Sequence, residues 1–404
     1  MNEPLVSTLR PADGPLVHPI GRPVQNGHAV RNGHAEVTDV PKVARPSGTR
    51  VVEVVEADRW NELLLGRGDY ELAQGWEWGE VQREAGFTPH RYAVLDGSAC
   101  IAAVSVTCRQ LPGLPYSVLY ASRGPLLDWK DTHAWHGILH AIRRLAERHR
   151  AIFFRVSPAV AHDDADLLSA LARHRFRPIA DDWTTWNAAR VVLLSSLDGD
   201  EAALVGRFRK GIRRDLAAAQ RRGARVRVAD DPADLVAFHR LSVEAGREKG
   251  YPVRPLARLE ALWNAYVARG NGVLLLTEHE GALLGGVLGL RFGRRAYLHR
   301  ATILRAGEGQ RLHQGPLVYW EFIRWAKAEG CDVIDWGGSG TRFPPSESDE
   351  GHGVYQFKSG FGADLHCWVP YHDLIFRPRL YGLARAAERW VLPRAWRLRA
   401  RLNR

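Results

Sequence analysis

Cysteine and methionine are scarce in this chain of 404 residues, and acidic residues are fewer than basic ones. Its four cysteines form no Cys-x-x-Cys pair and no Cys/His metal-ligand spacing. This pattern excludes a disulfide-rich secreted fold and a zinc module, so we expect reduced core thiols, no bound metal and a cytoplasmic location. The chain has no run of eighteen apolar residues, which excludes a membrane-spanning helix, and its N-terminus lacks the layout of a signal peptide.

Basic residues outnumber acidic ones, which gives the chain a strong positive charge. Fifty-six Lys and Arg face 45 Asp and Glu, which gives a net charge of +11 and a pI near 9.8. Such a balance indicates an anionic partner, namely nucleic acid, an acidic lipid surface or a phosphorylated substrate. An Arg-rich genome composition is the alternative. The length predicts two or three domains, each large enough for its own core.

Both ends of the chain differ from its middle. Residues 1–48 are rich in Pro, Gly, Asn and His without periodicity, which predicts a disordered tail, and a strand is expected from Thr49. Residues 376–404 contain nine Arg and one Glu interleaved with Trp and Leu. They form a basic amphipathic tail, and from residue 377 on we expect contact with an anionic membrane. A helix packed on the second domain, or a contact for tRNA, are the alternatives.

The middle of the chain repeats one order of elements. Each half contains a hairpin, a third strand, a helix and a final strand, at 91–109, 116–121, 133–148 and 152–156 in the first half and at 273–292, 296–301, 317–329 and 333–336 in the second. The hairpins turn at Asp96-Gly97 and Glu280-Gly281. Because the same order occurs twice, a tandem duplication is the natural interpretation.

The repeated order is that of an acyltransferase fold of the GNAT type. We therefore predict an α+β protein with two tandem GNAT-like domains, at 49–190 and 191–375, each with a mixed sheet flanked by helices. Two unrelated α+β domains are the alternative.

One stretch of the second half combines residues that suit acyl transfer. Strand 333–336 contains Asp335 and runs into Gly337-Gly338, and Phe357-Lys358-x-x-Phe361-Gly362 follows about twenty residues later. We expect Lys358 on a loop, held between the two Phe side chains, with its charge aimed into a cleft to stabilise an oxyanion or a phosphate. Asp335 could accept a proton from an attacking amine, or close the strand end by hydrogen bonds.

Three further stretches contain candidate binding residues. The run from Arg207 to Arg214 places several cations at helical spacing, which suits phosphate or a solvated surface helix. Residues 74–83 form an amphipathic helix with two Trp, which suits a binding site or a packed core. Arg123 and Asp128 flank a Gly-Pro turn and could form a structural ion pair.

These stretches resemble motifs of the FemABX family, the aminoacyl-tRNA-dependent transferases that build peptidoglycan side-chain bridges. The family patterns are F-K-x-x-F-G, D-x-G-G, R-x-x-I-R-K, Q-S-x-x-W-G-x-x-K and R-G-P-x-x-D. Gln82 stands where the family has a phosphate-contacting Lys, so either the neighbouring Arg83 replaces it or the acceptor differs. The resemblance implies a catalytic role for Lys358 and Asp335, and substrate binding by Arg209, Arg213, Gln82, Arg83, Trp78, Phe357, Arg123 and Asp128.

The resemblance also implies a function. We expect an N-acyltransferase that uses aminoacyl-tRNA as co-substrate, without a cofactor, and acts as a monomer on an amine of a phosphate-bearing acceptor such as a peptidoglycan precursor. We expect it in the cytoplasm, peripheral at the inner face of the plasma membrane. An acyl-CoA-dependent GNAT enzyme is the alternative, although residues 305–316 do not match the Q/R-x-x-G-x-G/A pyrophosphate loop and contain Pro316. A non-catalytic nucleic-acid-binding module, which rests on charge alone, leaves Lys358 unexplained.

Overall fold

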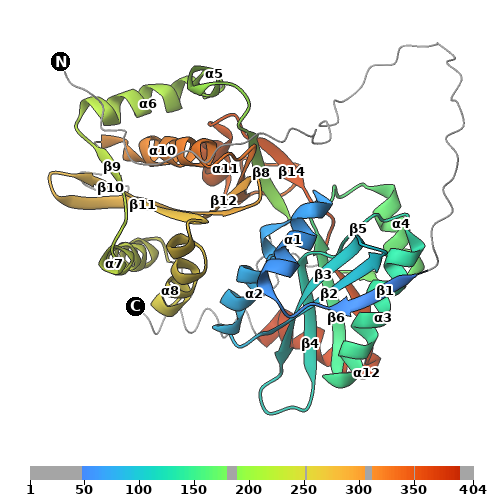
Figure 1. Cartoon of the computed structure of the whole chain (residues 1–404). Coiled ribbons are helices and arrows are strands. Elements are labelled where there is room, and N and C mark those ends of the chain that lie inside the picture. The colour runs from blue at the N-terminus through green and yellow to red at the C-terminus, as the bar shows by residue number, and fades with distance from the viewer. Residues whose placement is uncertain (1–47, 180–188, 251–252, 305–311, 350, 392–404) are drawn as a thin grey trace, which may run out of the picture. The chain divides into compact units, whose positions relative to one another are not determined.

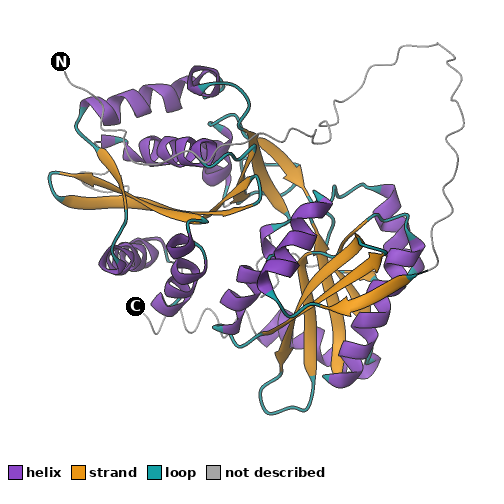
Figure 2. Ribbon diagram, viewed as in Figure 1, coloured by secondary structure: helices purple, strands orange, loops and turns teal. Residues whose placement is uncertain are grey.

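The computed structural model describes residues 48–179, 189–250, 253–304, 312–349 and 351–391. The predicted disordered tail lies outside the described residues, except for Gly48. The described residues form two β-sheets with helices packed on them (Figures 1 and 2).

The first sheet has eight strands in the order β1-β2-β3-β4-β6-β15-β7, with β5 beside β3. Its strands are β1 (Thr49–Glu53), β2 (Thr88–Asp96), β3 (Ala99–Gln110), β4 (Ser117–Arg123), β5 (Leu126–Leu127), β6 (Ala151–Pro158), β7 (Arg177–Pro178) and β15 (His372–Ile375). Its helices are α1 (Ala57–Arg67), η1 (Leu72–Gln74), α2 (Trp76–Arg83), α3 (Thr132–Arg148), α4 (Ala165–Arg173), α12 (Pro378–Ala386) and the π-helical turn η3 (Ala387–Val391).

The second sheet has seven strands in the order β14-β8-β13-β12-β11-β10-β9. They are β8 (Val191–Ser196), β9 (Arg225–Val228), β10 (Gly272–His279), β11 (Ala282–Phe292), β12 (Arg295–Ile303), β13 (Val333–Gly338) and β14 (Asp364–Cys367). The helices are α5 (Glu201–Gly206), α6 (Lys210–Arg221), α7 (Pro232–Lys249), α8 (Leu256–Ala265), η2 (Val267–Arg269), α10 (Gln314–Ala328) and α11 (His352–Ser359).

The structure confirms the predicted duplication. In the first domain β2, β3 and β4 are antiparallel, and α3 leads to β6, which pairs with β4 in parallel. In the second domain β10, β11 and β12 are antiparallel, and α10 leads to β13, which pairs with β12 in parallel. A parallel pair needs a crossover connection, and the helix supplies it in both halves. The predicted α+β class with mixed sheets is therefore correct.

The two sheets share part of their hydrophobic core. On β10 the alternation of side chains points Val273 and Leu275 toward α6 and α10, while Leu274 and Leu276 face the other way. Those second-face residues join one cluster with Trp60 and other apolar residues of the first domain. The two repeats therefore bury apolar surface against each other.

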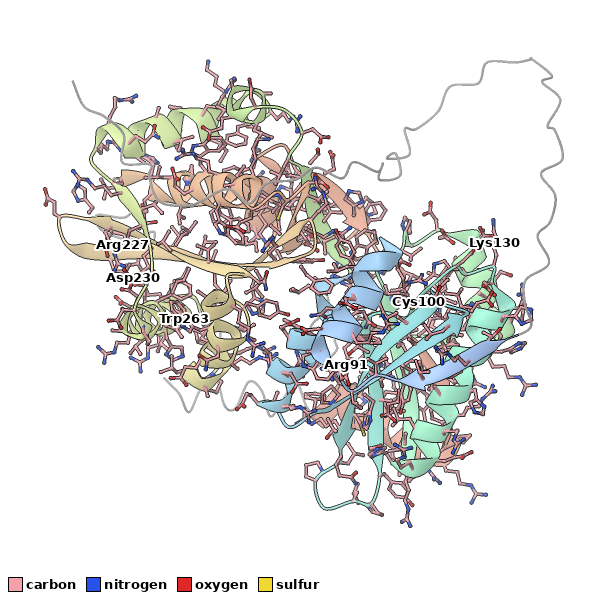
Figure 3. The ribbon with its side chains drawn as sticks, viewed as in Figure 1. Arg91, Cys100, Lys130, Arg227, Asp230 and Trp263 are labelled. Atoms are coloured by element: carbon pink, nitrogen blue, oxygen red, sulfur yellow. The ribbon has the colours of Figure 1, made fainter. Side chains whose placement is uncertain are left out.

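An arginine of the first domain contacts helix α2 in three ways. The guanidinium of Arg91, labelled in Figure 3, lies 3.5 Å from the centroid of the Trp76 ring. It also donates to the carbonyl of Trp76 at 2.9 Å and to the carboxylate of Glu80 at 2.8 Å. Arg91 is only 3% exposed, so these contacts compensate for burying its charge.

The C-terminal part of the chain corrects the predicted domain boundary. Strand β15 lies within the segment 191–375 that we assigned to the second domain, yet it pairs with β6 and β7 in the first sheet. The four-residue strand has no periodicity that could reveal its partner, and its neighbour in sequence is not its neighbour in space. The segment 376–391, predicted as a tail, follows β15 and packs on the first domain through Leu380, Tyr381 and Ala384.

Cys108, Cys331 and Cys367 are buried and Cys100 is half-buried, all as free thiols. Among the described residues we find no group of His, Cys, Asp and Glu that could hold a metal ion. None of the helices within those same ranges is long and apolar enough to cross a membrane.

Candidate active site

The amine of Lys358 lies at the exit of strand β13. Lys358 occupies the last turn of α11, and its Nζ donates to the carbonyl oxygens of Trp336 at 2.6 Å and Gly338 at 2.8 Å. An ammonium has three N–H donors. Two of them are used by the strand exit, so one remains for a ligand.

The predicted setting of Lys358 was wrong in two respects. Lys358 lies on a helix and not on a loop. The two Phe rings do not hold it between them: they contact each other with centroids 5.3 Å apart, and both rings contact Tyr319 of α10. Successive residues of a helix point in different directions, so Phe357 anchors α11 on the core while Lys358 turns to the strand exit.

Burial makes the amine of Lys358 unusually acidic. It lowers the pKa of Lys358 to about 8, and the nearby charge of Asp335 opposes this shift. Near neutral pH the amine is therefore mostly charged, yet it can lose its proton at little cost. A lysine with such a pKa suits either charge stabilisation or proton transfer.

Asp335 fixes the turn that presents the two carbonyls to Lys358. Its Oδ1 accepts a hydrogen bond from the N–H of Gly337 at 2.7 Å, and the side chain is buried. Gly337 has a φ of 70°, a left-handed conformation that favours glycine. Asp335 thus closes the strand end by a hydrogen bond, as one of the two interpretations expected. The other, a role as proton acceptor, stays a prediction.

A charged cluster continues from Asp335 toward the first domain. Glu71, just before η1, forms an ion pair with Arg295, the first residue of β12. Burial raises the pKa of Glu71, and the charges of Arg295 and Arg123 oppose that shift. Residues of both domains therefore meet in one electrostatic network.

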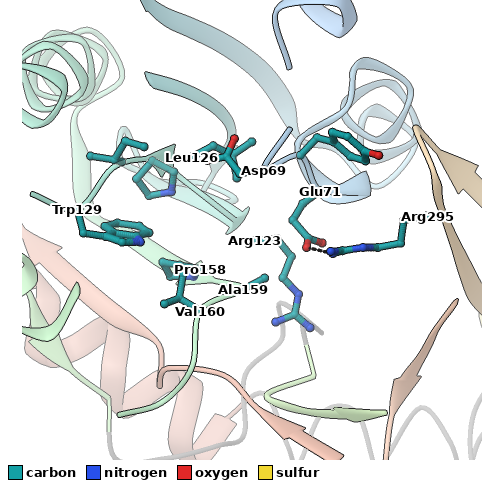
Figure 4. A pocket seen from close by; sticks show the side chains of 12 residues that line it. Asp69, Glu71, Arg123, Leu126, Trp129, Pro158, Ala159, Val160 and Arg295 are labelled. Atoms are coloured by element: carbon teal, nitrogen blue, oxygen red, sulfur yellow. Dashed lines mark hydrogen bonds and ion pairs between the residues drawn. The ribbon is translucent and has the colours of Figure 1, made fainter. Parts of the chain in front are cut away.

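Next to this cluster is a cavity of about 230 Å³ (Figure 4). Arg123, Glu71 and Arg295 form its polar wall, and Trp129, Leu126 and Val160 are among its apolar residues. The remaining lining residues are Asp69, Tyr70, Pro125, Leu127, Pro158 and Ala159. A cavity with an apolar wall and a few convergent charged groups is the usual form of a small-ligand site.

Arg123 links this cavity to the lysine site. Its Nη2 donates to the carbonyl of Ala189 at 2.6 Å. Ala189 in turn lies against Gly338, because a Cβ added to Gly338 would be 3.1 Å from the Cβ of Ala189. The carbonyl of Gly338 is one of the two that accept from Lys358. We find no ion pair between Arg123 and Asp128 in the described part of the chain, so that expectation was wrong. Asp128 is exposed, and its Oδ1 accepts from the backbone of Lys130.

Of the basic stretch, the structure brings Arg209 to the lysine helix. Arg209 precedes α6, its N–H donates to the carbonyl of Gly360 at 2.8 Å, and its guanidinium lies so close that a Cβ on Gly360 would be 2.9 Å from it. Gly360 comes two residues after Lys358. Arg213, one turn along α6, is exposed. Arg209 can therefore meet an anion that approaches this end of α11.

The predicted residues of α2 lie elsewhere. Trp78 contacts the ring of His299 edge-on at 5.8 Å, which places it against the second domain. Arg83 forms an ion pair with Glu80 at 2.6 Å. Neither Trp78, Arg83 nor Gln82 lines the described cavity. His299 is half-buried, and desolvation lowers its pKa to about 3, so it is a weak base.

Sequence reasoning missed three residues of this region. Gln74 donates to the carbonyl of Ser122 at 2.6 Å and accepts from the N–H of Ser105 at 2.7 Å, which fixes the strand end before Arg123. Its position in the Q-S-x-x-W-G pattern was the available signal. Glu71 and Arg295 carried none, because they stand 224 residues apart and only the fold pairs them.

Comparisons with known proteins agree with this architecture. Residues 206–358 match the family model described as acetyltransferase (GNAT) domain, and residues 69–175 match the FemAB family. The lipid II:glycine glycyltransferase of Staphylococcus aureus is 21% identical over 408 residues, covering 83% of this chain and 94% of that protein. That of Staphylococcus saprophyticus is 24% identical over 217 residues, and the match spans about half of each chain, 52% and 51%.

Solved structures show the same fold. The crystal structure of FemX aligns with a TM-score of 0.75 at 18% identity, covering 83% of this chain and 99% of that one. A tandem GNAT protein from the clavulanic acid biosynthesis pathway aligns with a TM-score of 0.51 at 14% identity, covering 81% and 98%. Fold and site together define an acyltransferase built from two GNAT-like domains. Within that class, the first domain is similar to the FemAB family over residues 69–175.

Proposed function

We propose that this enzyme transfers an aminoacyl group from aminoacyl-tRNA to an amine of a phosphate-bearing acceptor of the peptidoglycan-precursor type, without a bound cofactor. The observation that carries the proposal is the half-buried Lys358, whose ammonium is fixed by two carbonyls at the edge of a cluster of charged residues from both domains. The relatives named lipid II:glycine glycyltransferase support the acceptor class.

The reaction needs little more than positioning and charge stabilisation, because the aminoacyl ester is already activated. The acceptor nitrogen attacks the ester carbonyl carbon, a C–N bond forms, and the carbonyl oxygen becomes an oxyanion. The remaining N–H of Lys358 can donate to that oxyanion. When the intermediate collapses, the C–O bond to the tRNA ribose breaks and the ribose oxygen takes a proton, while the attacking nitrogen loses one.

Two groups are suited to move that proton. Asp335 uses one carboxylate oxygen for the N–H of Gly337, and a carboxylate has further acceptor sites. Lys358, with a pKa of about 8, can also release and regain a proton near neutral pH. In the proposed mechanism Asp335 accepts the proton of the attacking amine, and Lys358 stays charged while the oxyanion exists.

The substrates take the two sides of this site. Arg209 and Arg213 offer guanidinium groups for the phosphates of the tRNA end, because arginine makes bidentate bonds to phosphate. The cavity beside Arg123 and Glu71 takes the part of the acceptor that carries the amine. Its charged wall is continuous with the strand exit that holds Lys358.

The acyl-CoA alternative is less favoured by the described structure. The segment expected to bind pyrophosphate is 305–316, and its residues 305–311 lie outside the described residues. The helix that follows it, α10, has Pro316 in its first turn, where one N–H is missing, and Gln314 is only 1% exposed. A diphosphate at a helix N-terminus needs open N–H groups.

Donor consumption tests the proposal. The protein is incubated with a mixture of charged tRNAs, or separately with acetyl-CoA, in the presence of a peptidoglycan precursor. We expect loss of the aminoacyl ester beyond spontaneous hydrolysis, and much slower loss with Lys358→Ala. Consumption of acetyl-CoA alone would establish the alternative. The proposal also includes contact of residues 377–404 with an anionic membrane, where a lipid-linked acceptor lies.

A further inference from the structure

The segment after β15 is fixed to the first domain by a buried group of charges. Arg155 of β6 is fully buried and donates to both carboxylate oxygens of Asp373 at 2.8 and 2.9 Å. Its Nη1 donates to Glu388 of η3 at 2.8 Å, and Tyr381 of α12 donates to Asp373 at 3.0 Å. Removing one partner of such a group leaves an uncompensated buried charge, so α12 and η3 are held firmly in one orientation.

That orientation leaves an apolar and basic face exposed. Tyr381, Ala384 and Glu388 point toward the sheet, at helical spacing. Leu383 is 69% exposed and Trp390 is 53% exposed on the remaining face. Within residues 376–391, which the structure describes, the exposed cations are Arg377, Arg379 and Arg389. The single acid of residues 376–404, Glu388, is turned inward, so the outer face carries only positive charge.

The tip of the β3–β4 hairpin adjoins this face. Leu111 and Tyr116 pack in one cluster with Leu380 of α12, and the guanidinium of Arg377 lies 5.5 Å from the centroid of the Tyr116 ring. Between them Leu114 is 53% exposed. In Figure 1 the hairpin reaches the lower edge of the first domain, beside α12.

We propose that the outer face of α12 and η3, together with the hairpin tip at Leu114, docks on an anionic lipid bilayer; this rests on the proposed function and assigns the membrane contact to particular residues. Leucine and tryptophan insert at the interface between head groups and acyl chains, while arginines among them bind lipid phosphates. A nucleic-acid partner would use the cations and leave Leu383 and Leu114 in water. The face thus fits lipid better than RNA.

The experiment is co-sedimentation of the whole protein with vesicles of phosphatidylcholine, alone or mixed with phosphatidylglycerol. We expect binding to the mixed vesicles that falls as salt rises. The double variant Leu383→Glu and Trp390→Ala should bind at least about tenfold more weakly, because it removes two inserted side chains and adds an acid. Arg377→Gln and Arg379→Gln should each cost about fivefold.

A matched control removes an exposed apolar side chain elsewhere. Val228 of β9 is 58% exposed on the second sheet, and Val228→Glu should bind vesicles as the wild type does. Near-ultraviolet circular dichroism checks that each variant is folded. Aminoacyl-tRNA consumption without vesicles should be unchanged in all of them, so loss of the activity itself is distinguished from loss of docking.

Three outcomes would overturn the assignment. The wild type could ignore phosphatidylglycerol vesicles, the Leu383 and Trp390 double variant could bind them normally, or Val228→Glu could weaken binding equally. Weaker tRNA binding in the double variant, with vesicle binding intact, would assign the face to RNA instead.

Discussion

Replacing Lys358 by methionine tests how the desolvated amine affects the stability of the protein, independently of any role that the amine has in catalysis. The pKa of Lys358 is about 8 in the folded protein, against 10.5 for an exposed lysine. Between these values the unfolded chain binds more protons than the folded protein, so stability rises with pH. Integration predicts that Lys358 adds about 2 kcal/mol of stability between about pH 7 and about pH 9.5.

Methionine has no titrating group, so the variant lacks this increment. At pH 7 it also avoids a desolvation cost of about 3 kcal/mol. The carbonyls of Trp336 and Gly338 lose their donor, at about 1 kcal/mol each. We therefore expect Lys358→Met to be about 1 kcal/mol more stable than the wild type at pH 7 and less stable at the higher pH.

The assay is urea denaturation of both proteins at about pH 7 and about pH 9.5. The difference in unfolding free energy between them cancels the other titrating groups. A difference that changes by less than about 0.5 kcal/mol with pH would refute the buried-amine reasoning, since about 2 kcal/mol is expected.

Kinetics of the same position test its role. If the ammonium stabilises the oxyanion, Lys358→Ala and Lys358→Met should lower kcat by about a hundredfold or more. Lys358→Arg should rescue poorly, because a planar guanidinium cannot make the same two bonds to the strand exit and still reach the substrate. A raised KM with unchanged kcat would instead indicate phosphate binding.

Three further predictions concern the surroundings of this site. Arg209→Ala with Arg213→Ala should raise KM for aminoacyl-tRNA, by a factor that shrinks as salt rises, and an unchanged KM at low salt would remove α6 from the site. Glu71→Gln should lower stability in urea by about 2 kcal/mol, because the half-buried guanidinium of Arg295 loses its partner, and should raise KM for the acceptor; equal stability would mean that the pair contributes nothing. Glu388→Ala should destabilise the protein by about 3 kcal/mol through Arg155, and adding Arg155→Leu should not recover that loss, because the buried Asp373 then lacks its cation; denaturation of both variants checks this.

The repeated hairpin, strand, helix and strand could be predicted because local patterns define them. The turns at Asp96-Gly97 and Glu280-Gly281, and the apolar strands beside them, are visible within short windows of sequence. Strands β8, β14 and β15 are short, and each pairs with strands remote in sequence. No local pattern records such pairing, so these strands were missed.

At the site, the motifs predicted which residues matter, but they did not predict the local structure around those residues. Lys358 was singled out correctly as a candidate, but α11 follows a long polar loop and contains Gly353, so its helix was not expected. The position of Arg295 beside Glu71 depends on how the two domains pack, which single-sequence reasoning does not reach. The role of each residue stays a prediction until kinetics test it.

The return of β15 to the first sheet has a consequence for synthesis of the chain. A ribosome releases the first repeat long before it makes residues 372–375, so the edge of β6 waits unpaired while the whole second repeat emerges. During that interval Arg155 lacks both of its carboxylate partners. The first domain therefore completes its folding last, although it is made first, in contrast to proteins whose domains fold in the order of their synthesis.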